Sequence, residues 1–207
     1  MSSITDIKQQ VKNPNKLSIF VDGKYSFSLT LDQLSENKAV RIGNNIEPEQ
    51  ITEYKKLTKL TNQYIRMVNL IYARPRSEQE IRLKLKLKQV DLDEIEDLIT
   101  KLKSQDFLND QNFANWWVEG RKNSSKPTSK RKLQSELAQK GVKADIAGLA
   151  IEEHFTQEDE LLSLKKLIEK KKDKYQDPQK LMSFLASKGF SYVQIKQAIS
   201  SESEDNF

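Results

Sequence analysis

Apolar positions in the middle of the chain occur twice at a constant spacing of 52 residues. The paired apolar positions are Ile81, Leu85 and Val90 in one copy and Leu133, Leu137 and Val142 in the other. Pro75, Ser77 and Lys88 recur with them as Pro127, Ser129 and Lys140. A third copy keeps Asp177, Leu181, Leu185, Lys188 and Phe190. Such a period is typical of one supersecondary unit used several times, each burying its apolar face partly against its neighbours. It predicts a scaffold that presents a surface.

The spacing inside each copy predicts a helix with a defined start and end. Ser77, Ser129 and Asp177 stand four residues before the first apolar position, where a side-chain oxygen can cap the free N–H groups of a helix. The second and third copies close at Gly141 and Gly189, which can adopt the left-handed conformation that ends helices. The first copy has Gln89 there, so its turn is expected to be strained or differently shaped.

A short third helix is expected to follow in each copy. Residues 91–94 and 191–194 both have the pattern of a capping box at its start. The stretch from Arg82 to Lys88 instead alternates strictly, which by itself indicates a strand. We interpret it as helix because its equivalents in the other copies have helical spacing and because Lys and Leu favour helix. Leu83 and Leu87 should then lie off the core and meet a neighbouring repeat or a partner.

The first sixty residues have the pattern of a small β-sheet. Residues 17–21 and 25–29 are strand-like runs joined by Asp22-Gly23-Lys24. Asp-Gly between such runs indicates a hairpin, since both residues tolerate a positive φ. Residues 4–11 are expected to add a third strand, connected by a turn at Asn13-Pro14-Asn15.

A helix is expected to begin near Pro48, since proline suits a first helical turn, and to end at Leu57 or Leu60. The whole pattern predicts an all-α protein of three tandem three-helix repeats that form an elongated, curved body with a small β-hairpin or three-stranded extension at the N-terminus. The expected domains are residues 1–60 for the hairpin and helix, 61–108, 109–157 and 158–207 for the three repeats, with an acidic tail at the C-terminus.

Composition fits a helical scaffold with a thin core. Of the 207 residues, 36% are hydrophobic and 31% are charged, while Gly and Pro number only 6 and 5. The absence of cysteine excludes disulfides and thiol chemistry. A net charge of +5 indicates a polyanionic or acidic partner. No apolar run reaches the length of a membrane helix and no signal-peptide core is evident, so we expect a cytoplasmic protein without a membrane partner.

Catalytic patterns are missing from the sequence. It contains no Gly-rich phosphate loop, no HExxH and no zinc-ligand spacing. The single histidine, His154, ends a predicted helix, where it would ease the helix dipole. Asp91 and Asp93 are interpreted as capping or solvated carboxylates. We therefore expect a protein that is not an enzyme and uses no cofactor or metal.

Basic side chains are concentrated in the second repeat. Between Glu119 and Lys143 there are eight basic residues and two acidic ones, Glu119 and Glu136. The basic ones are Arg121, Lys122, Lys126, Lys130, Arg131, Lys132, Lys140 and Lys143. Such an excess focuses a positive field. Two interpretations stay open: a surface for a polyanion or an acidic protein, and a solvated helix face.

Both tryptophans of the chain fall on one predicted helix. Phe113 and Trp117, four residues apart, should form its core face, while Trp116 points about 100° away. Trp116 is therefore a candidate interface anchor, since tryptophan is enriched among interface hot spots. Packing between repeats is the other interpretation of this side chain.

Three stretches resemble one known family. Asp110-Gln111-Asn112-Phe113-Ala114 with Trp117-Val118 and Arg121 looks like its Asp-x-x-(aromatic)-Ala-x-x-(aromatic)-Val-x-x-Arg signature. Residues 126–142, with Pro127, Ser129 and Lys140-Gly141-Val142, are similar to its Pro-x-Ser…Lys-Gly-(Ile/Val) block, and residues 72–81 match the start of its first repeat. The family is RecX, the regulators of the RecA recombinase, and the resemblance covers residues 64–199.

The resemblance implies a non-enzymatic protein that lies along the RecA–DNA filament and inhibits RecA's ATPase and strand exchange. We also expect a monomer. Basic side chains in the matched stretches would bind the filament: Arg74, Arg76, Arg121, Lys130, Arg131, Lys132 and Lys140. The competing hypothesis is a basic helical protein that binds single- or double-stranded DNA directly, with no recombinase partner. Direct binding at similar affinity in the absence of RecA would distinguish the two.

Overall fold

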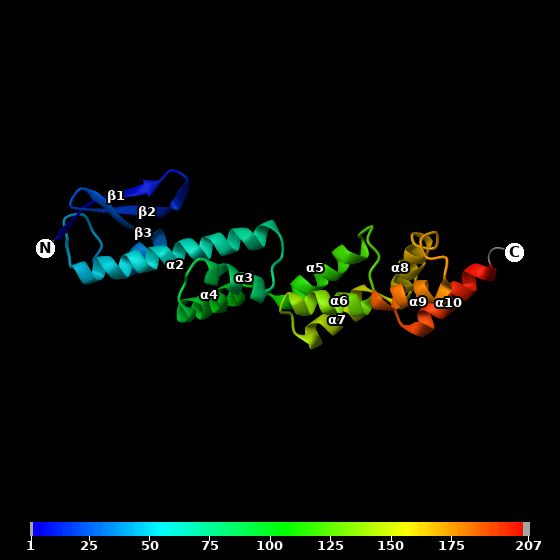
Figure 1. The fold of residues 1–207 in the computed structure, drawn as a ribbon. Helices are drawn as coiled ribbons and strands as arrows, with labels where there is room; N and C mark the ends of the chain where they lie inside the picture. The colour runs from blue at the N-terminus through cyan, green and yellow to red at the C-terminus, as the bar shows by residue number, and fades with distance from the viewer. Residues whose placement is uncertain (1, 205–207) are drawn as a thin grey trace. The chain divides into compact units, whose positions relative to one another are not determined.

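The computed structural model describes residues 2–204, with side chains described as far as residue 200, and falls into two compact units that divide between Asn69 and Leu70 (Figure 1). The described part ends inside the last helix. Asp205 of the expected acidic tail, and the side chains of Glu202 and Glu204, lie outside the described residues.

The N-terminal unit contains a four-stranded antiparallel sheet. Its strands are β1 (Ser2–Gln10), β2 (Asn13–Val21), β3 (Lys24–Thr30) and β4 (Asn45–Ile46), in the spatial order β3-β2-β1-β4. The short helix α1 (Leu31–Glu36) follows β3 and begins with a capping box made by Thr30 and Gln33. The sequence pattern did not predict β4 or α1, which are too short to show a period.

The expected hairpin is confirmed. Asp22 and Gly23 both have positive φ, 50° and 78°, and join β2 to β3. The expected turn at residues 13–15 was wrong: these residues already belong to β2, and the turn lies at Val11 and Lys12. The sheet buries Ile19, Phe27 and Leu29 completely in the core of this unit.

The helix α2 (Pro48–Ala73) is longer than expected. It does not end at Leu57 or Leu60, because no proline or glycine interrupts the chain between Pro48 and Pro75. Within the N-terminal unit, Thr58 of α2 satisfies the open edge of β3: its hydroxyl accepts from Ser28 N at 3.0 Å and donates to Ser28 O at 2.7 Å. The helix therefore covers an edge that would otherwise expose unpaired backbone groups.

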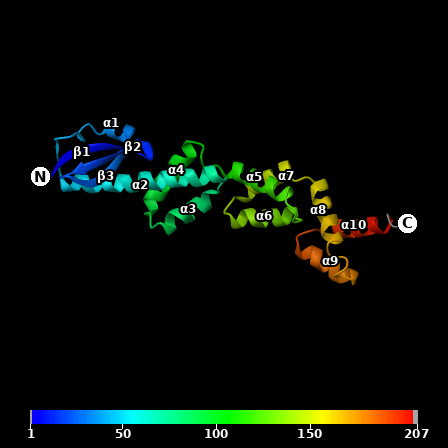
Figure 2. The ribbon, with the colours of Figure 1, turned by 90° about the horizontal axis from the view of Figure 1, so that it is seen from above.

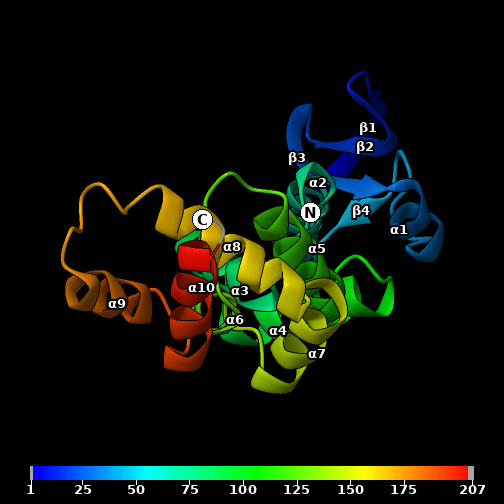
Figure 3. The ribbon, with the colours of Figure 1, turned by 90° about the vertical axis from the view of Figure 1, so that its right-hand side faces the viewer.

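The first repeat begins within α2, since its family match starts at residue 64. The second unit contains the other eight described helices of the repeats. They are α3 (Glu78–Leu87), α4 (Leu92–Ser104), α5 (Asp110–Lys122), α6 (Lys130–Gln139), α7 (Ala144–His154), α8 (Gln157–Glu169), α9 (Pro178–Ser187) and α10 (Tyr192–Glu204). In the second repeat α7 contacts both α5 and α6 (Figure 2). In the third, α10 lies beside α8 and α9 (Figure 3). The expected class is confirmed: a mostly helical protein of three tandem three-helix repeats with a small N-terminal sheet.

The apolar spacing places the expected side chains in the cores of the repeats. Ile81 and Leu85 are buried in α3, and the equivalent positions in the other repeats are buried as well. The alternating stretch from Arg82 to Lys88 is helical, and Leu83 and Leu87 are 51% and 78% exposed, as expected for positions off the core.

The starts of the second helices follow the prediction more closely than the starts of the third. Ser77, Ser129 and Asp177 each accept hydrogen bonds from backbone N–H groups in the first helical turn. Ser191 forms the expected capping box with Gln194. Asp91 occupies the N-cap of α4 but makes no side-chain cap, so that part of the capping-box prediction was wrong.

The three turns that end the second helices have one shape. Gly141 and Gly189 have φ of 78° and 95°, which confirms the left-handed prediction, and Gln89 has φ of 55°. Val90 N and Val142 N both donate to the carbonyl five residues earlier. The turn at Gln89 is therefore not differently shaped. It is strained, because a residue with a Cβ is less stable in this region.

A serine hydroxyl joins each repeat to the next. Ser77 Oγ donates to Lys140 O at 2.7 Å, and Ser129 Oγ donates to Lys188 O at 2.9 Å. Both serines are fully buried. Each hydroxyl thus accepts from its own helix start and donates to the end of the equivalent helix in the following repeat.

A carboxylate reinforces each of these junctions. Asp110 at the start of α5 accepts from Glu78 N at 2.8 Å, and Glu160 of α8 accepts from Lys130 N at 2.7 Å. In both cases the first helix of one repeat satisfies a free N–H group in the second helix of the repeat before it. Burial raises the pKa of Asp110, and the hydrogen bond from Glu78 N opposes that rise.

The two glycines also meet the preceding repeat closely. A Cβ on Gly141 would lie 2.4 Å from the Cβ of Gln79, and one on Gly189 would lie 2.5 Å from Ser129 Oγ. Both separations are far below van der Waals contact. Glycine is therefore required at these positions by the backbone conformation and by the packing of the repeats.

We expect Gly141→Ala to destabilise the fold by more than about 1 kcal/mol, because it adds a steric overlap to the cost of a positive φ. Gly120→Ala is the matched control: Gly120 lies in α5 with open space around its Cβ position, so alanine there should be neutral or stabilise by up to about 1 kcal/mol. Chemical denaturation of the two variants measures both effects. Equal stabilities would contradict the packing argument.

A second prediction distinguishes two contributions of the Ser129 hydroxyl to stability: capping of its own helix and the hydrogen bond to the next repeat. Ser129→Asp keeps an acceptor for the helix start but loses the donor to Lys188 O, and should cost roughly 1–3 kcal/mol. Asp177→Ser changes only a cap on an exposed position and should stay within about 0.5 kcal/mol of the parent. Thermal unfolding followed by circular dichroism compares them. A Ser129→Asp protein as stable as the parent would show that the hydroxyl contributes nothing between repeats.

Candidate binding surface

Three basic side chains of the second unit converge on one carboxylate, Glu80, in the first turn of α3. Arg74 donates through both terminal nitrogens at 3.0 and 3.1 Å, and Lys140 Nζ lies 3.1 Å from Oε1. Arg76 approaches Oε2 at 3.8 Å. Lys140 belongs to the second repeat and the others to the first, so Glu80 ties the two repeats together. Three cations around one carboxylate leave positive charge in excess.

The ionised form of the Glu80 carboxyl group is favoured over the protonated form. Burial acts to raise the pKa of Glu80, but the hydrogen bonds from Arg74 and Lys140 outweigh it, and the pKa is lowered. The carboxylate is therefore ionised at neutral pH, and its side chain is only 17% exposed. Arg74, Arg76 and Lys140 are held in place by this contact and are only partly available to a partner.

The tryptophans continue this cluster along α5. The guanidinium of Arg74 lies 5.7 Å from the ring centroid of Trp116, and Lys140 Nζ lies 5.1 Å from that of Trp117. Both geometries are those of cation–π contacts. Trp117 Nε1 donates to Glu136 Oε2 at 3.1 Å, and Arg121 Nε donates to the same oxygen at 3.0 Å. Arg121 is thereby neutralised by its own repeat.

Trp116 is partly packed and partly exposed, so it has features of both interpretations, packing within the protein and an anchor for a partner. Its ring packs against Phe113 with centroids 6.0 Å apart, yet the side chain remains 38% exposed. Phe113 is fully buried and Trp117 is partly buried against the same core, as expected from their spacing. Trp116 is therefore a rigid aromatic surface, fixed by Arg74 on one side and open to solvent on the other.

Lys130, Arg131 and Lys132 lie apart from that cluster, in the first turn of α6. Within the described residues none of the three has a carboxylate in ion-pair distance. Arg131 and Lys132 are exposed, and Lys130 is half-buried. Of the seven predicted basic residues, these three therefore keep their charge free for a partner.

The remaining residues considered for chemistry lie at helix ends. His154 ends α7, with Nδ1 3.2 Å from Glu119 Oε1. Asp91 and Asp93 lie at the exposed start of α4. Among residues 2–204, no group of three or more His, Asp or Glu side chains is arranged to hold a metal ion. In the same range no helix is long and apolar enough to cross a membrane.

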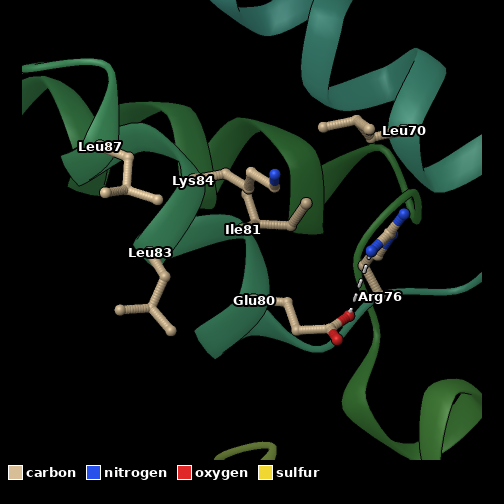
Figure 4. Close-up of a pocket in the computed structure, with 7 residues that line it drawn as sticks. All are labelled: Leu70, Arg76, Glu80, Ile81, Leu83, Lys84 and Leu87. Carbon is tan, nitrogen blue, oxygen red and sulfur yellow. Dashed lines mark ion pairs between the residues drawn. The ribbon is translucent and has the colours of Figure 1, made fainter.

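An open apolar hollow lies beside α3 (Figure 4). Its lining comprises Leu70, Arg76, Glu80, Ile81, Leu83, Lys84 and Leu87. Leu83 and Leu87 project from the helix into solvent around it, so the first repeat presents apolar surface that no other described repeat covers. This is the surface that the alternating sequence of α3 had indicated.

Two site residues were missed from the sequence, Glu80 and Glu136, the carboxylates that hold the cations. The four-residue spacing of Arg76 and Glu80 indicates one ion pair, which the structure forms between the residue before the N-cap of α3 and its first turn. The contact of Glu80 with Lys140 joins positions 60 residues apart and has no signal in a single sequence.

The fold and this surface define a class: a helical-repeat protein that presents charged and aromatic side chains across its repeats. Family models match each repeat in order, as "RecX, first three-helix domain" over residues 64–102, the second domain over 109–151 and the third over 158–199. The chain belongs to the RecX family.

Named relatives cover nearly the whole chain. A "Regulatory protein RecX" from Clostridium perfringens (strain SM101 / Type A) is 32% identical over 93% of this chain and 92% of its own length. One from Caldanaerobacter subterraneus subsp. tengcongensis is 28% identical over 95% of this chain and 98% of its own.

Solved structures agree with the family assignment. A crystal structure of regulatory protein RecX superposes with a TM-score of 0.79 at 26% identity and covers 95% of this chain and 100% of that one. RecX from Lactobacillus salivarius gives a TM-score of 0.62 at 27% identity, over 69% of this chain and 95% of its own.

The Glu80 cluster predicts a pH-dependent stability. Because the pKa of Glu80 is lowered in the folded state, its contribution is complete above the ordinary glutamate pKa and is lost as the pH falls through the lowered value. Glu80→Gln should therefore cost roughly 1–3 kcal/mol near neutral pH and little in acid. Melting curves of the variant and the parent across this pH range test it. Glu152→Gln, on an exposed position, is the control; a gap that does not shrink in acid would contradict the prediction.

Proposed function

We propose that this protein binds the RecA–DNA filament and limits RecA's ATPase and strand exchange, without turnover of its own. The observation that carries the proposal is the match of three successive RecX domains, in order, across the repeats. The RecX family is understood as regulators of RecA, and the chain's family resemblance extends to the stretches that contain the basic side chains.

Repetition supports a filament as the partner. The same serine–carbonyl bond and the same glycine contact join repeat one to repeat two and repeat two to repeat three. Modules joined in one way present equivalent surfaces at regular intervals. A filament offers repeated subunits, so successive modules can meet successive equivalent sites.

Charge supports a site beside DNA. Lys130, Arg131 and Lys132 hold three positive charges with no carboxylate partner in the described structure. Cations next to a phosphate backbone release condensed counterions, which produces a salt-sensitive attraction. In this proposal the three residues approach the filament, and Trp116 is an apolar anchor. The other predicted cations shape the surface through their ion pairs with Glu80 and Glu136: Arg74, Arg76, Arg121 and Lys140.

The proposal also includes a cytoplasmic location, since RecA acts on chromosomal DNA, and a monomeric chain that needs no cofactor. The domain boundaries that accompany it are 61–108, 109–157 and 158–207 for the three repeats, preceded by an extension of residues 1–60.

A direct DNA-binding protein without a recombinase partner is the second candidate, and the unpaired cations at the start of α6 favour it equally. Binding of labelled single- and double-stranded DNA in the absence of RecA separates the candidates. An affinity for DNA that does not change when RecA is present, together with no effect on RecA's ATPase, would favour the second.

The test of the main proposal reverses the three free charges. Lys130→Glu, Arg131→Glu and Lys132→Glu combined should weaken inhibition of RecA-dependent ATP hydrolysis on single-stranded DNA and make the remaining inhibition less sensitive to salt. Melting should stay within about 1 kcal/mol of the parent, since Arg131 and Lys132 are exposed and the half-buried Lys130 has no ion-pair partner to lose.

A matched variant controls for net charge. Lys165, Lys166 and Lys180 are exposed in the third repeat, and their reversal to glutamate changes the charge by the same amount. We expect this control to inhibit RecA nearly as well as the parent. If the α6 variant folds normally and inhibits like the control at low and moderate salt, the start of α6 is only a solvated face.

A further inference from the structure

The N-terminal unit contains a second group of free cations, on α2. Lys55, Lys59 and Arg66 are exposed, and with Asn62 they follow the spacing of four, three and four residues that places side chains on one helix face. We call this group the α2 stripe. Lysines four residues apart repel each other and destabilise a helix slightly. A negatively charged group at this face would offset that repulsion.

A polar hollow opens along the α2 stripe next to β3. Besides the three cations, it is lined by Ser26 of β3 and by Thr58, Asn62 and Gln63 of α2, and every lining residue is polar. No carboxylate is among them. Gln63 is only 6% exposed, and its Oε1 has no hydrogen-bond partner. Buried polar atoms without partners are rare. Because a carboxamide can turn by 180°, Gln63 can offer either a donor or an acceptor to a ligand or its water.

A buried lysine adds charge beneath the hollow. Lys16 of β2 is 6% exposed, and its ammonium group donates to Asn62 Oδ1, a neutral oxygen. Burial, together with the positive charge of Arg66, lowers the pKa of Lys16. A buried charge without a counter-charge destabilises a fold. An anion bound in the hollow would compensate Lys16 and the α2 stripe at once.

The contrast with the repeats is informative. There the half-buried cations Arg74, Lys140 and Arg121 each contact a carboxylate. Within the described residues, no carboxylate lies in ion-pair distance of Lys16, Lys55, Lys59 or Arg66. This unit therefore keeps a buried lysine and three neighbouring cations without a carboxylate, whereas Arg74, Lys140 and Arg121 are paired.

We propose that the α2 stripe and its hollow bind the phosphodiester backbone of a nucleic acid. Ammonium, guanidinium, hydroxyl and carboxamide groups are those that contact phosphate oxygens, and they position a protein on a strand without reading its sequence. The hollow has no aromatic side chain to stack on a base and no apolar side chain to hold an anchor of an acidic peptide. Its chemistry therefore fits phosphates better than bases or an acidic protein.

The dimensions fit a strand of several nucleotides. From Lys55 to Arg66 the helix rises about 16 Å, at ~1.5 Å per residue. Such a row can meet more than one phosphate along a strand. Neutralising three phosphates should change the logarithmic salt dependence of binding by about 2 to 3.

This site deepens the proposed function, since it assigns DNA contact to a part of the chain outside the three repeats, and it can be tested without RecA. The variant combines Lys55→Gln, Lys59→Gln and Arg66→Gln, which keeps polar, helix-compatible side chains. The matched control combines Lys12→Gln, Lys24→Gln and Arg41→Gln, three exposed cations of the same unit that do not line the hollow. Circular dichroism melts establish that both fold as the parent does.

Binding is measured by fluorescence anisotropy of a labelled mixed-sequence oligonucleotide, with the full chain and a series of salt concentrations. We expect the stripe variant to lose about tenfold or more in affinity and about 2 units of salt slope, while the control stays within about twofold of the parent. Inhibition of RecA's ATPase is recorded separately, so that a parent protein that binds DNA without affecting RecA would contradict the proposed function and leave this site standing.

Three results would overturn the inference. One is an equal loss in the stripe variant and the control, which would show an effect of net charge only. Another is a parent protein that does not bind the oligonucleotide. The third is stronger binding of labelled poly-glutamate than of the oligonucleotide, abolished in the stripe variant, which would assign the α2 stripe to an acidic protein.

Discussion

The hydroxyl of a buried serine at the start of each second helix is the interaction on which the repeat array depends. Ser77 and Ser129 each accept from their own helix and donate to a carbonyl of the next repeat, and Gly141 and Gly189 allow the two backbones to come that close. A hydroxyl can do both because it is donor and acceptor at once. Orphan groups at two helix ends are therefore satisfied by one side chain.

This constraint explains why the ends of the array depart from the repeat pattern. Gln89 takes the left-handed position in the first repeat and is exposed, so its side chain meets no other repeat there. Asp177 caps the third repeat and is exposed, and within the described residues no further repeat offers a carbonyl to which a hydroxyl would donate. A carboxylate accepts only, which is sufficient at that end. The departures at Gln89 and Asp177 thus mark positions released from packing between repeats.

The same junctions decide which charges a partner can reach. Glu80 and Glu136 bind Arg74, Arg76, Lys140 and Arg121, so these cations stabilise the contact between repeats before they meet anything else. The cations at the start of α6 and those of the α2 stripe have no carboxylate in ion-pair distance within the described structure. Each group lies in a different unit of the chain. Both proposed contacts with a polyanion, one on a helical repeat and one on the N-terminal extension, use cations of these two groups.

The sequence by itself determined the repeats, the hairpin and most helix starts, because these follow from local spacing, capping and turn chemistry. Leu83 and Leu87 were placed off the core because the equivalent stretches of the other copies have helical spacing. The end of α2 at Ala73 was missed because the pattern changed within one uninterrupted helix. Only the tertiary structure decided which cations are free: the contact of Lys140 with Glu80, and the isolation of Lys16 beneath the α2 stripe, join positions distant in the chain. The sequence shows which residues are charged, but which of them form ion pairs depends on the side chains that folding brings together.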